Sequence, residues 1–138
     1  MKLRDKDFQE LYQEANKLSN KKELTPMLKY GQVGTALMTG DGSVYTGISI
    51  KAPSGLGNCS EYAAIVTMLK DDKHDIKKMI SVRNGEILPP CGRCRELVTQ
   101  ITHGDVQIAV DESTAVSIED LLPYPWTFKN TEAKTRRS

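Results

Sequence analysis

The three cysteines of this chain lie in two short clusters, and each cluster has the spacing of a metal site. Cys91 and Cys94 form a Cys-x-x-Cys pair, and Cys59 is followed two residues later by Glu61. Three thiolates fill three corners of a zinc tetrahedron and leave the fourth open for water, as in catalytic zinc sites. Zinc lowers the pKa of a bound water from about 16 to about 7. We therefore predict Zn²⁺ as a cofactor, with Cys59, Cys91 and Cys94 as its ligands.

Glu61 has the position of a proton shuttle beside that metal. A carboxylate two residues after Cys59, at the start of a helix, is able to face the open side of the site and to carry protons to a substrate. Taken alone, Glu61 would be interpreted as an exposed residue in a first helical turn, where the helix dipole favours acidic side chains. The neighbouring thiols favour the catalytic interpretation.

Arg95 directly follows the second cluster, and its positive charge could offset the negative charge of the metal site. Three thiolates around Zn²⁺ leave the site with a net negative charge, which makes the metal a poorer Lewis acid. An arginine that hydrogen-bonds a thiolate would offset this charge, so we predict that Arg95 supports the ligands from the second shell. A surface arginine is the open alternative, and Arg93 receives no role.

Two other interpretations of the cysteines remain open. Cysteine is a common core residue, so the three thiols could be buried and inert. A redox dithiol at Cys91 and Cys94 is the second possibility, but it leaves Cys59 and Glu61 without a role. Because all three cysteines have metal-site spacing, the zinc site is favoured over both.

The elements that must position these residues follow from hydrophobic periodicity. Apolar residues at helical spacing predict an amphipathic helix over residues 4–19, and a nearly continuous apolar stretch predicts a buried helix over 60–71. A third helix is expected over 91–102, ended by Gly104, and a short one over 118–122. Five strands are expected, at residues 33–39, 44–50, 76–82, 106–110 and within 111–117.

This order of elements implies a mixed sheet covered by helices. Both cysteine clusters then lie at helix N-termini, where the helix dipole and the free N–H groups favour thiolates. We expect one domain over residues 1–128 and a polar, flexible tail over 129–138.

Composition argues against several classes of partner. The 138 residues suffice for one hydrophobic core, and 19 basic against 18 acidic residues give a net charge of +1. This balance offers no electrostatic basis for binding nucleic acid or a membrane surface. The sequence has no apolar run of about 18 residues, and its first residues are too polar for a signal peptide. An odd number of cysteines suits a reducing compartment, so we expect a cytoplasmic protein.

The two clusters resemble the zinc site of the cytidine deaminases. Cys59-x-Glu61 together with Pro90-Cys91-Gly-x-Cys94-Arg95 is similar to that family's pattern in its all-cysteine variant. Within the superfamily the chain is most similar to the blasticidin S deaminases, through residues 87–95 and 114–123. The likeness covers about residues 25–126. It implies a three-layer α/β/α cytidine deaminase-like fold with a mixed sheet of about five strands, and a homotetramer.

The substrate pocket is where the chain departs from the family. Cytidine deaminases usually carry an Asn-x-Glu that binds ribose hydroxyls, and by position this motif falls on Ser49-Ile50-Lys51. A lysine cannot accept a hydrogen bond from a hydroxyl. Lys51 could instead meet a carboxylate or a phosphate, although a surface lysine is the plainer interpretation. Tyr124 and Trp126 could cover a pocket of this or a neighbouring subunit, or pack the C-terminus onto the domain.

The sequence thus predicts a zinc-dependent hydrolytic deaminase of an aminopyrimidine nucleoside or analogue, cytidine-like or blasticidin S, that releases ammonia. A non-catalytic zinc protein that sequesters a nucleoside-like ligand is one alternative, and the intact Glu61 argues against it. A nucleic-acid cytosine deaminase is another, but such enzymes usually carry histidine as first ligand, and the near-neutral charge gives no support.

Overall fold

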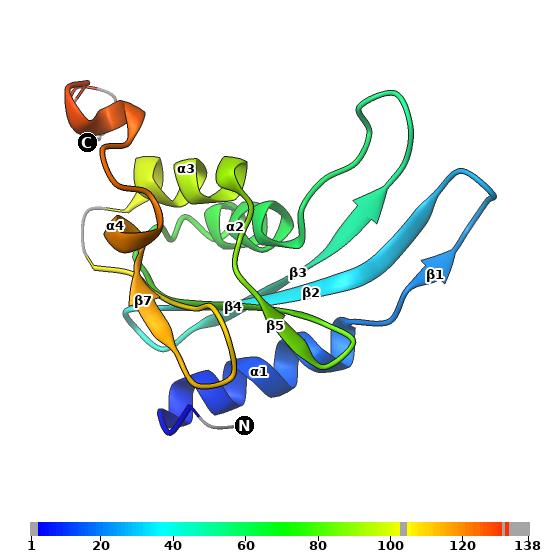
Figure 1. The fold of residues 1–138 in the computed structure, drawn as a ribbon, viewed down its shortest axis with the longest axis horizontal. Helices are drawn as coiled ribbons and strands as arrows, with labels where there is room; N and C mark the ends of the chain where they lie inside the picture. Colours follow the sequence, from blue (N-terminus) through cyan, green and yellow to red (C-terminus); the bar gives the residue numbers. More distant parts are fainter. Residues whose placement is uncertain (1–2, 103–104, 131, 133–138) are drawn as a thin grey trace.

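A mixed sheet lies between two layers of helices in the computed structural model, which describes residues 3–102, 105–130 and 132. Helix α1 (Lys6–Leu18) covers one face of the sheet, and helices α2 (Ser60–Lys70) and α3 (Gly92–Ile101) cover the other (Figure 1). The predicted three-layer α/β/α arrangement is confirmed.

Within the described residues the sheet has seven strands, so the prediction of about five is too low. The two additional strands have two and three residues, which is too short to show an alternating pattern in the sequence. Strands β4 and β6 pair in parallel, and the other described pairs are antiparallel. The strands are β1 (Lys22–Glu23), β2 (Lys29–Thr39), β3 (Val44–Lys51), β4 (Ile76–Arg83), β5 (Glu86–Leu88), β6 (Gln107–Ala109) and β7 (Ala115–Ser117).

Three further differences from the sequence-based expectation concern element ends and burial. Strand β2 starts at Lys29 rather than at residue 33, because Tyr30 already pairs with Ile50 before a register shift. Helix α2 is not buried all round, since Val66 is 50% exposed on its outer face. Gly104, the expected end of α3, lies outside the described residues, as does most of the predicted tail.

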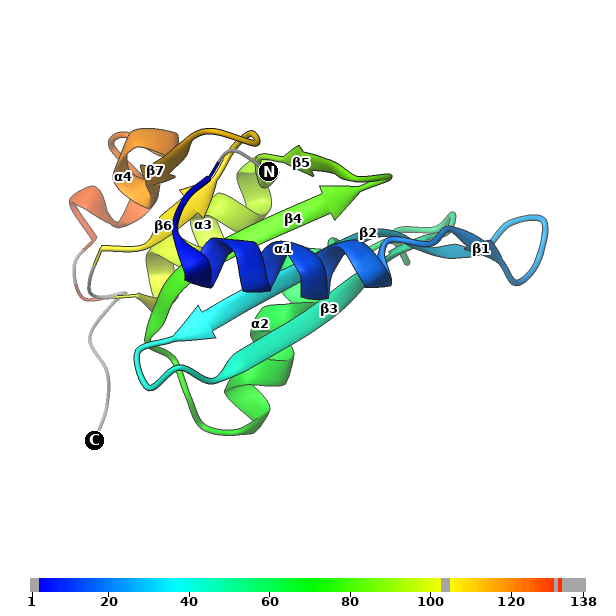
Figure 2. The ribbon, with the colours of Figure 1, turned by 90° about the horizontal axis from the view of Figure 1, so that it is seen from below.

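The chain after β7 forms two short helical pieces, α4 (Ile118–Leu121) and the 3-10 helix η1 (Trp126–Phe128). They follow the sheet edge beside α3 (Figure 2). No helix in the described ranges is long and apolar enough to cross a membrane.

The core consists of two apolar clusters, one on each face of the sheet. Alternation along β2 sends Leu37 to the cluster under α2 and α3 and sends Ala36 to the cluster under α1. Because each helix layer is held by its own cluster, the two helices that carry the cysteines are fixed against the same face of the sheet.

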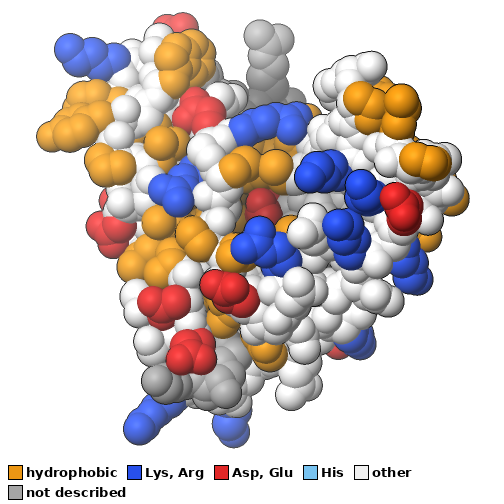
Figure 3. All heavy atoms as spheres, turned by 45° about the vertical axis from the view of Figure 1, so that its right-hand side comes forward, with side chains coloured by type: hydrophobic (Ala, Val, Ile, Leu, Met, Phe, Trp, Pro, Cys, Tyr) orange, Lys and Arg blue, Asp and Glu red, His pale blue; other side chains and the backbone are white. Residues whose placement is uncertain are grey.

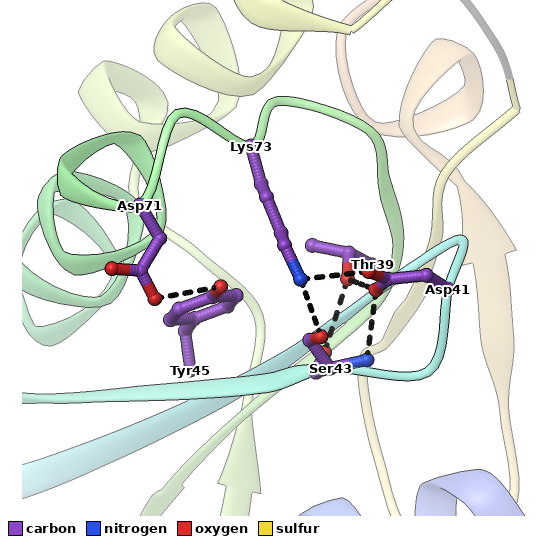
Figure 4. A network of polar contacts seen from close by, with 6 residues as sticks. All are labelled: Thr39, Asp41, Ser43, Tyr45, Asp71 and Lys73. Atoms are coloured by element: carbon purple, nitrogen blue, oxygen red, sulfur yellow. Dashed lines mark hydrogen bonds and ion pairs between the residues drawn. The ribbon is translucent and has the colours of Figure 1, made fainter.

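A hydrogen-bonded network holds the far end of α2 against the β2–β3 turn (Figure 4). The Lys73 ammonium donates to Asp41 Oδ2 and to Ser43 Oγ, each at 2.7 Å. The Tyr45 hydroxyl donates to Asp71 Oδ2 at 3.0 Å. The hydrogen bond from Lys73 is the largest of the causes that hold the pKa of Asp41 below its ordinary value. The network therefore contributes at neutral pH and weakens as Asp41 is protonated in acid.

Gly47 is the point of closest approach between β3 and α2. A Cβ at this position would lie 2.6 Å from the carbonyl oxygen of Ser60 and still closer to the amide nitrogen of Ala64. Both are backbone atoms, so the helix itself would have to move. We expect Gly47→Ala to lower the free energy of unfolding by about 1 to 3 kcal/mol or more. Urea unfolding measures this, with Gly92→Ala, where an added Cβ meets nothing within 4 Å, as the comparison. An unchanged midpoint for Gly47→Ala would contradict the close packing.

Candidate zinc centre

Both cysteine clusters lie at the N-termini of helices on the same side of the sheet. Cys59 is the N-cap residue of α2, and Cys91 is the N-cap residue of α3. Cys94 lies in the first turn of α3 and is fully buried. Neither N-cap side chain makes a capping hydrogen bond within the described part of the chain. The thiols therefore face free N–H groups and the positive ends of two helix dipoles, which favour thiolates.

The structure brings the three predicted ligands and Glu61 into one cluster. The three Sγ atoms and one carboxylate oxygen of Glu61 all lie within 4.8 Å of one another. The Sγ atoms of Cys59 and Cys91 are 3.3 Å apart. A tetrahedron with Zn–S bonds of about 2.3 Å has Sγ–Sγ edges of about 3.8 Å, so this edge would open by about half an ångström. The donor set fits zinc in number, chemistry and spacing.

Burial and the neighbouring groups shift the pKa values of the three thiols in different directions. Burial and then the charge of Glu61 raise the pKa of Cys94 well above its ordinary value. Burial and then the hydrogen bond with Cys91 raise the pKa of Cys59. Burial also acts to raise the pKa of Cys91, but the nearby Cys94 N–H and the other two thiols outweigh it and lower this pKa. Three thiolates beside a carboxylate become stable together when a soft divalent cation binds them.

Glu61 is held in the interior by hydroxyl groups. Its side chain is 6% exposed, and its Oε1 accepts hydrogen bonds from Ser81 at 3.0 Å, from Ser60 at 3.1 Å and from Thr35 at 3.4 Å. None of these three hydroxyl residues was selected from the sequence. Their signal is a hydroxyl residue inside an otherwise apolar strand, which Thr35 and Ser81 both show.

The cluster opens into a cavity of about 380 Å³. Strand β3 contributes Ser49 and Lys51 to its wall, and α3 contributes Arg93. A cavity of this size is within the range of small-molecule sites. A larger hollow, of about 740 Å³, lies over α4 and holds none of the cluster residues. The chemistry of the cluster, and not the size of the hollow, identifies the smaller cavity as the candidate active site.

Comparison with known proteins decides the family. A family model described as the cytidine and deoxycytidylate deaminase zinc-binding region matches residues 5–110. The chain belongs to this family. Membership confirms the resemblance seen in the sequence, the class of hydrolytic deaminases and Zn²⁺ as the cofactor.

Individual relatives carry both names that the sequence suggested. A cytidine deaminase of Halalkalibacterium halodurans is 30% identical over 102 residues, which cover 70% of this chain and 77% of that protein. A blasticidin-S deaminase of Bacillus cereus is 26% identical over 108 residues, which cover 69% and 76%. The crystal structure of cytidine deaminase from Mycobacterium tuberculosis has a TM-score of 0.74 and 25% identity, and the match covers 88% of this chain and 98% of that one.

The pocket wall of this deaminase family member is basic at the end of β3. Lys51 is exposed and stands opposite Lys29 in the β2–β3 register. Two like charges in such a pair repel each other. Lys and Arg side chains gather on the face that Figure 3 turns forward, the side of the molecule where β1 lies in Figure 1. Lys51 therefore has a basic cross-strand neighbour, and that neighbour, Lys29, has Glu23 as an acidic partner at 4.0 Å.

Ser49 and Arg93 occupy the same wall in different ways. The Ser49 hydroxyl accepts a hydrogen bond from the Val33 N–H at 3.0 Å. This bond satisfies a backbone N–H within the register shift of β2 between Tyr30 and Gly34. The Arg93 guanidinium donates to Asn58 Oδ1 at 2.9 Å and lies 4.5 Å from the centre of the Tyr62 ring. Arg93 received no role from sequence analysis, but in the structure it lines the cavity.

Arg95 contacts backbone oxygens instead of sulfur. Its Nε donates to the carbonyl of Pro90 at 2.8 Å, and one terminal nitrogen donates to the carbonyl of Leu121 at 2.9 Å. Arg95 thus hydrogen-bonds the carbonyl of Pro90, the residue before Cys91, in place of the expected hydrogen bond to a thiolate. The long guanidinium reaches past the ligands to α4, which lies far away in the sequence.

Tyr124 and Trp126 do not line the cavity at the cluster. Tyr124 is 80% exposed and Trp126 is 61% exposed. The Tyr124 ring packs edge to face on Phe128, with ring centres 5.2 Å apart, beside the larger hollow. A contribution of either aromatic residue to a neighbouring subunit's pocket stays a prediction.

Proposed function

We propose that the cavity at Cys59, Cys91 and Cys94 binds an aminopyrimidine nucleoside or a close analogue and that Glu61 moves the protons of its hydrolytic deamination. The observation that carries this proposal is the convergence of three Sγ atoms and the Glu61 carboxylate within 4.8 Å, in a member of the cytidine and deoxycytidylate deaminase family. Ammonia release by the purified zinc protein tests it.

The three thiols would hold the zinc, which when bound supplies a water that is activated at neutral pH. The carboxylate of Glu61 takes one proton from that water and gives it to the ring nitrogen of the pyrimidine. Addition of a water oxygen at C4 would make this carbon tetrahedral. A second proton passes through Glu61 to the amino group, the C4–N bond breaks, and ammonia leaves a uracil-type product. Arg95 keeps the Pro90–Cys91 backbone in place.

A cavity wall with Lys51 and Arg93 supports a substrate that carries an anionic group on its sugar. We expect unmodified cytidine to be a poor substrate and cytidine monophosphate or blasticidin S to be better. In Lys51→Glu, kcat/KM should fall more for the anionic substrates than for cytidine. An exposed ion pair contributes about 0.2 to 1 kcal/mol, which is up to about fivefold in kcat/KM.

The measurement is the absorbance change for cytidine, deoxycytidine, cytidine monophosphate and blasticidin S. Lys6→Glu makes the same charge reversal on α1, across the sheet, and serves as the matched control. Efficient turnover of cytidine by the wild type, or an equal loss on all substrates in Lys51→Glu, would contradict an anion subsite. Full zinc content without ammonia release from any substrate would favour a sequestering protein.

We also propose a cytoplasmic homotetramer. Support comes from apolar side chains that are exposed in the single chain, on the outer face of α2 at Val66 and Leu69 and after α4 at Tyr124 and Trp126. Light scattering of the purified protein tests the tetramer.

A further inference from the structure

Three buried hydroxyl groups from three different elements meet at one oxygen of Glu61. Thr35 lies on β2, Ser60 opens α2, and Ser81 lies on β4, and their side chains are only 0, 1 and 3% exposed. Besides their contacts to Oε1 of Glu61, Thr35 Oγ1 lies 2.8 Å from Ser60 Oγ and 2.6 Å from Ser81 Oγ. We call Thr35, Ser60 and Ser81 the hydroxyl triad.

The triad stands on two paired strands of the sheet and on the start of α2. Thr35 and Ser81 are direct cross-strand partners in the β2–β4 ladder, near the middle of the sheet. Ser60 is fixed because β3 and α2 approach closely at Gly47. Hydrogen bonds from such positions hold a carboxylate in one place, which is what a catalytic group needs from its supporting residues.

Counting protons shows what the triad does to the carboxylate. Each hydroxyl has one proton to donate, so three protons serve the five contacts among these four side chains. When Ser60 and Ser81 donate to Oε1, Thr35 gives its proton to one of the two serines or to Oε1. In each of these arrangements Ser60 and Ser81 donate to Oε1, and Oε2 receives none of the three contacts.

We propose that the hydroxyl triad positions Glu61, so that Oε1 serves as the anchor and Oε2 as the oxygen that exchanges protons during deamination. This rests on the proposed function. A structural explanation also exists, because Thr35 and Ser81 satisfy each other across the ladder. The two explanations differ in their kinetic consequence, since a positioning residue acts on the chemical step and a purely structural one acts on stability.

The test combines Thr35→Val and Ser81→Ala, which remove two of the three hydroxyls. We expect kcat to fall about 10- to 100-fold, because a small misplacement of a catalytic group has effects of this order. KM should change less than about twofold, and the zinc content should stay at the wild-type level. Thr35→Ser keeps the hydroxyl and should retain most of the activity. Thr39→Val removes a buried hydroxyl from the same strand without touching Glu61 and is the matched control.

Two outcomes would overturn the triad as a positioning device. One is a loss of stability in urea with kcat unchanged per zinc-loaded chain. The other is a further loss of kcat when the same substitutions are made in a Glu61→Gln background, where residues that act through Glu61 should add little.

A crystal structure of the Thr35→Val, Ser81→Ala variant decides the question without activity. A Glu61 carboxylate that has left its position, or that occupies several, supports the proposal, and an unmoved carboxylate overturns it. If the wild type deaminates none of the substrates above, the proposed function fails, while this structure still tells whether the triad positions Glu61.

Discussion

The Glu61→Gln variant is expected to keep its zinc and its fold and to lose deamination by a factor of about 10² to 10⁴. The amide is nearly isosteric with the carboxylate, and its oxygen can still accept from the hydroxyls at Oε1. It cannot take up and release a proton, however, and the proposed reaction uses Glu61 in more than one step. The loss is measured as kcat for ammonia release, normalised to the zinc content of each preparation.

Glu119→Gln is the matched control for this experiment. Glu119 also lies in the first turn of a helix, α4, but it is exposed and distant from the cysteine cluster. Its replacement should leave kcat unchanged. Near-normal turnover by Glu61→Gln itself would remove Glu61 from the mechanism and leave its burial to be explained by packing alone.

Removal of two ligands should have an equally large effect on the metal. We expect the wild type to bind about one zinc per chain and Cys91→Ala plus Cys94→Ala to lose it together with all measurable deamination. Both residues come from the start of α3, so this variant retains only Cys59 and Glu61 as donors in the cluster. Two donors do not hold zinc against dialysis, because protein zinc sites use three or four.

Metal analysis after dialysis measures this, and Glu61→Gln, which keeps all three thiols, is the internal control. A wild-type protein that is well folded and free of zinc would refute the assignment. Zinc that survives the double substitution would show that its ligands lie elsewhere in the chain.

The sequence carried enough information to place the cluster because its signals are local. The spacing of Cys91 and Cys94 lies within one helical turn. The apolar stretch in 60–71 and the apolar face of 91–102 located both helix starts within a residue. The resemblance to the cytidine deaminases further predicted that the N-termini of these two helices lie close together. The long strands were predicted for the same reason, since alternation over several residues is visible without knowledge of the partner strand.

The parts that were missed depend on contacts between distant segments. Thr35 and Ser81 are 46 residues apart and meet only through the β2–β4 register, which no local pattern specifies. Arg95 was expected at sulfur because three thiolates leave a zinc site with excess negative charge, but its guanidinium donates to a carbonyl 26 residues further along the chain. Side-chain partners of long polar residues are set by the tertiary structure, and sequence spacing limits them only weakly.

The catalytic side of the cavity is buried and its substrate side is exposed, and this difference affects how such an enzyme evolves. Glu61 and its hydroxyls are buried residues of α2 and of the strands β2 and β4, and substitutions at buried positions commonly reduce stability by about 1 kcal/mol or more. Lys51 and Arg93 are exposed at a strand end and in a first helical turn, where most substitutions alter stability by no more than about 0.5 kcal/mol. Selection is therefore free to exchange the substrate through one or two mutations at the rim, while the reaction itself is inherited unchanged with the fold.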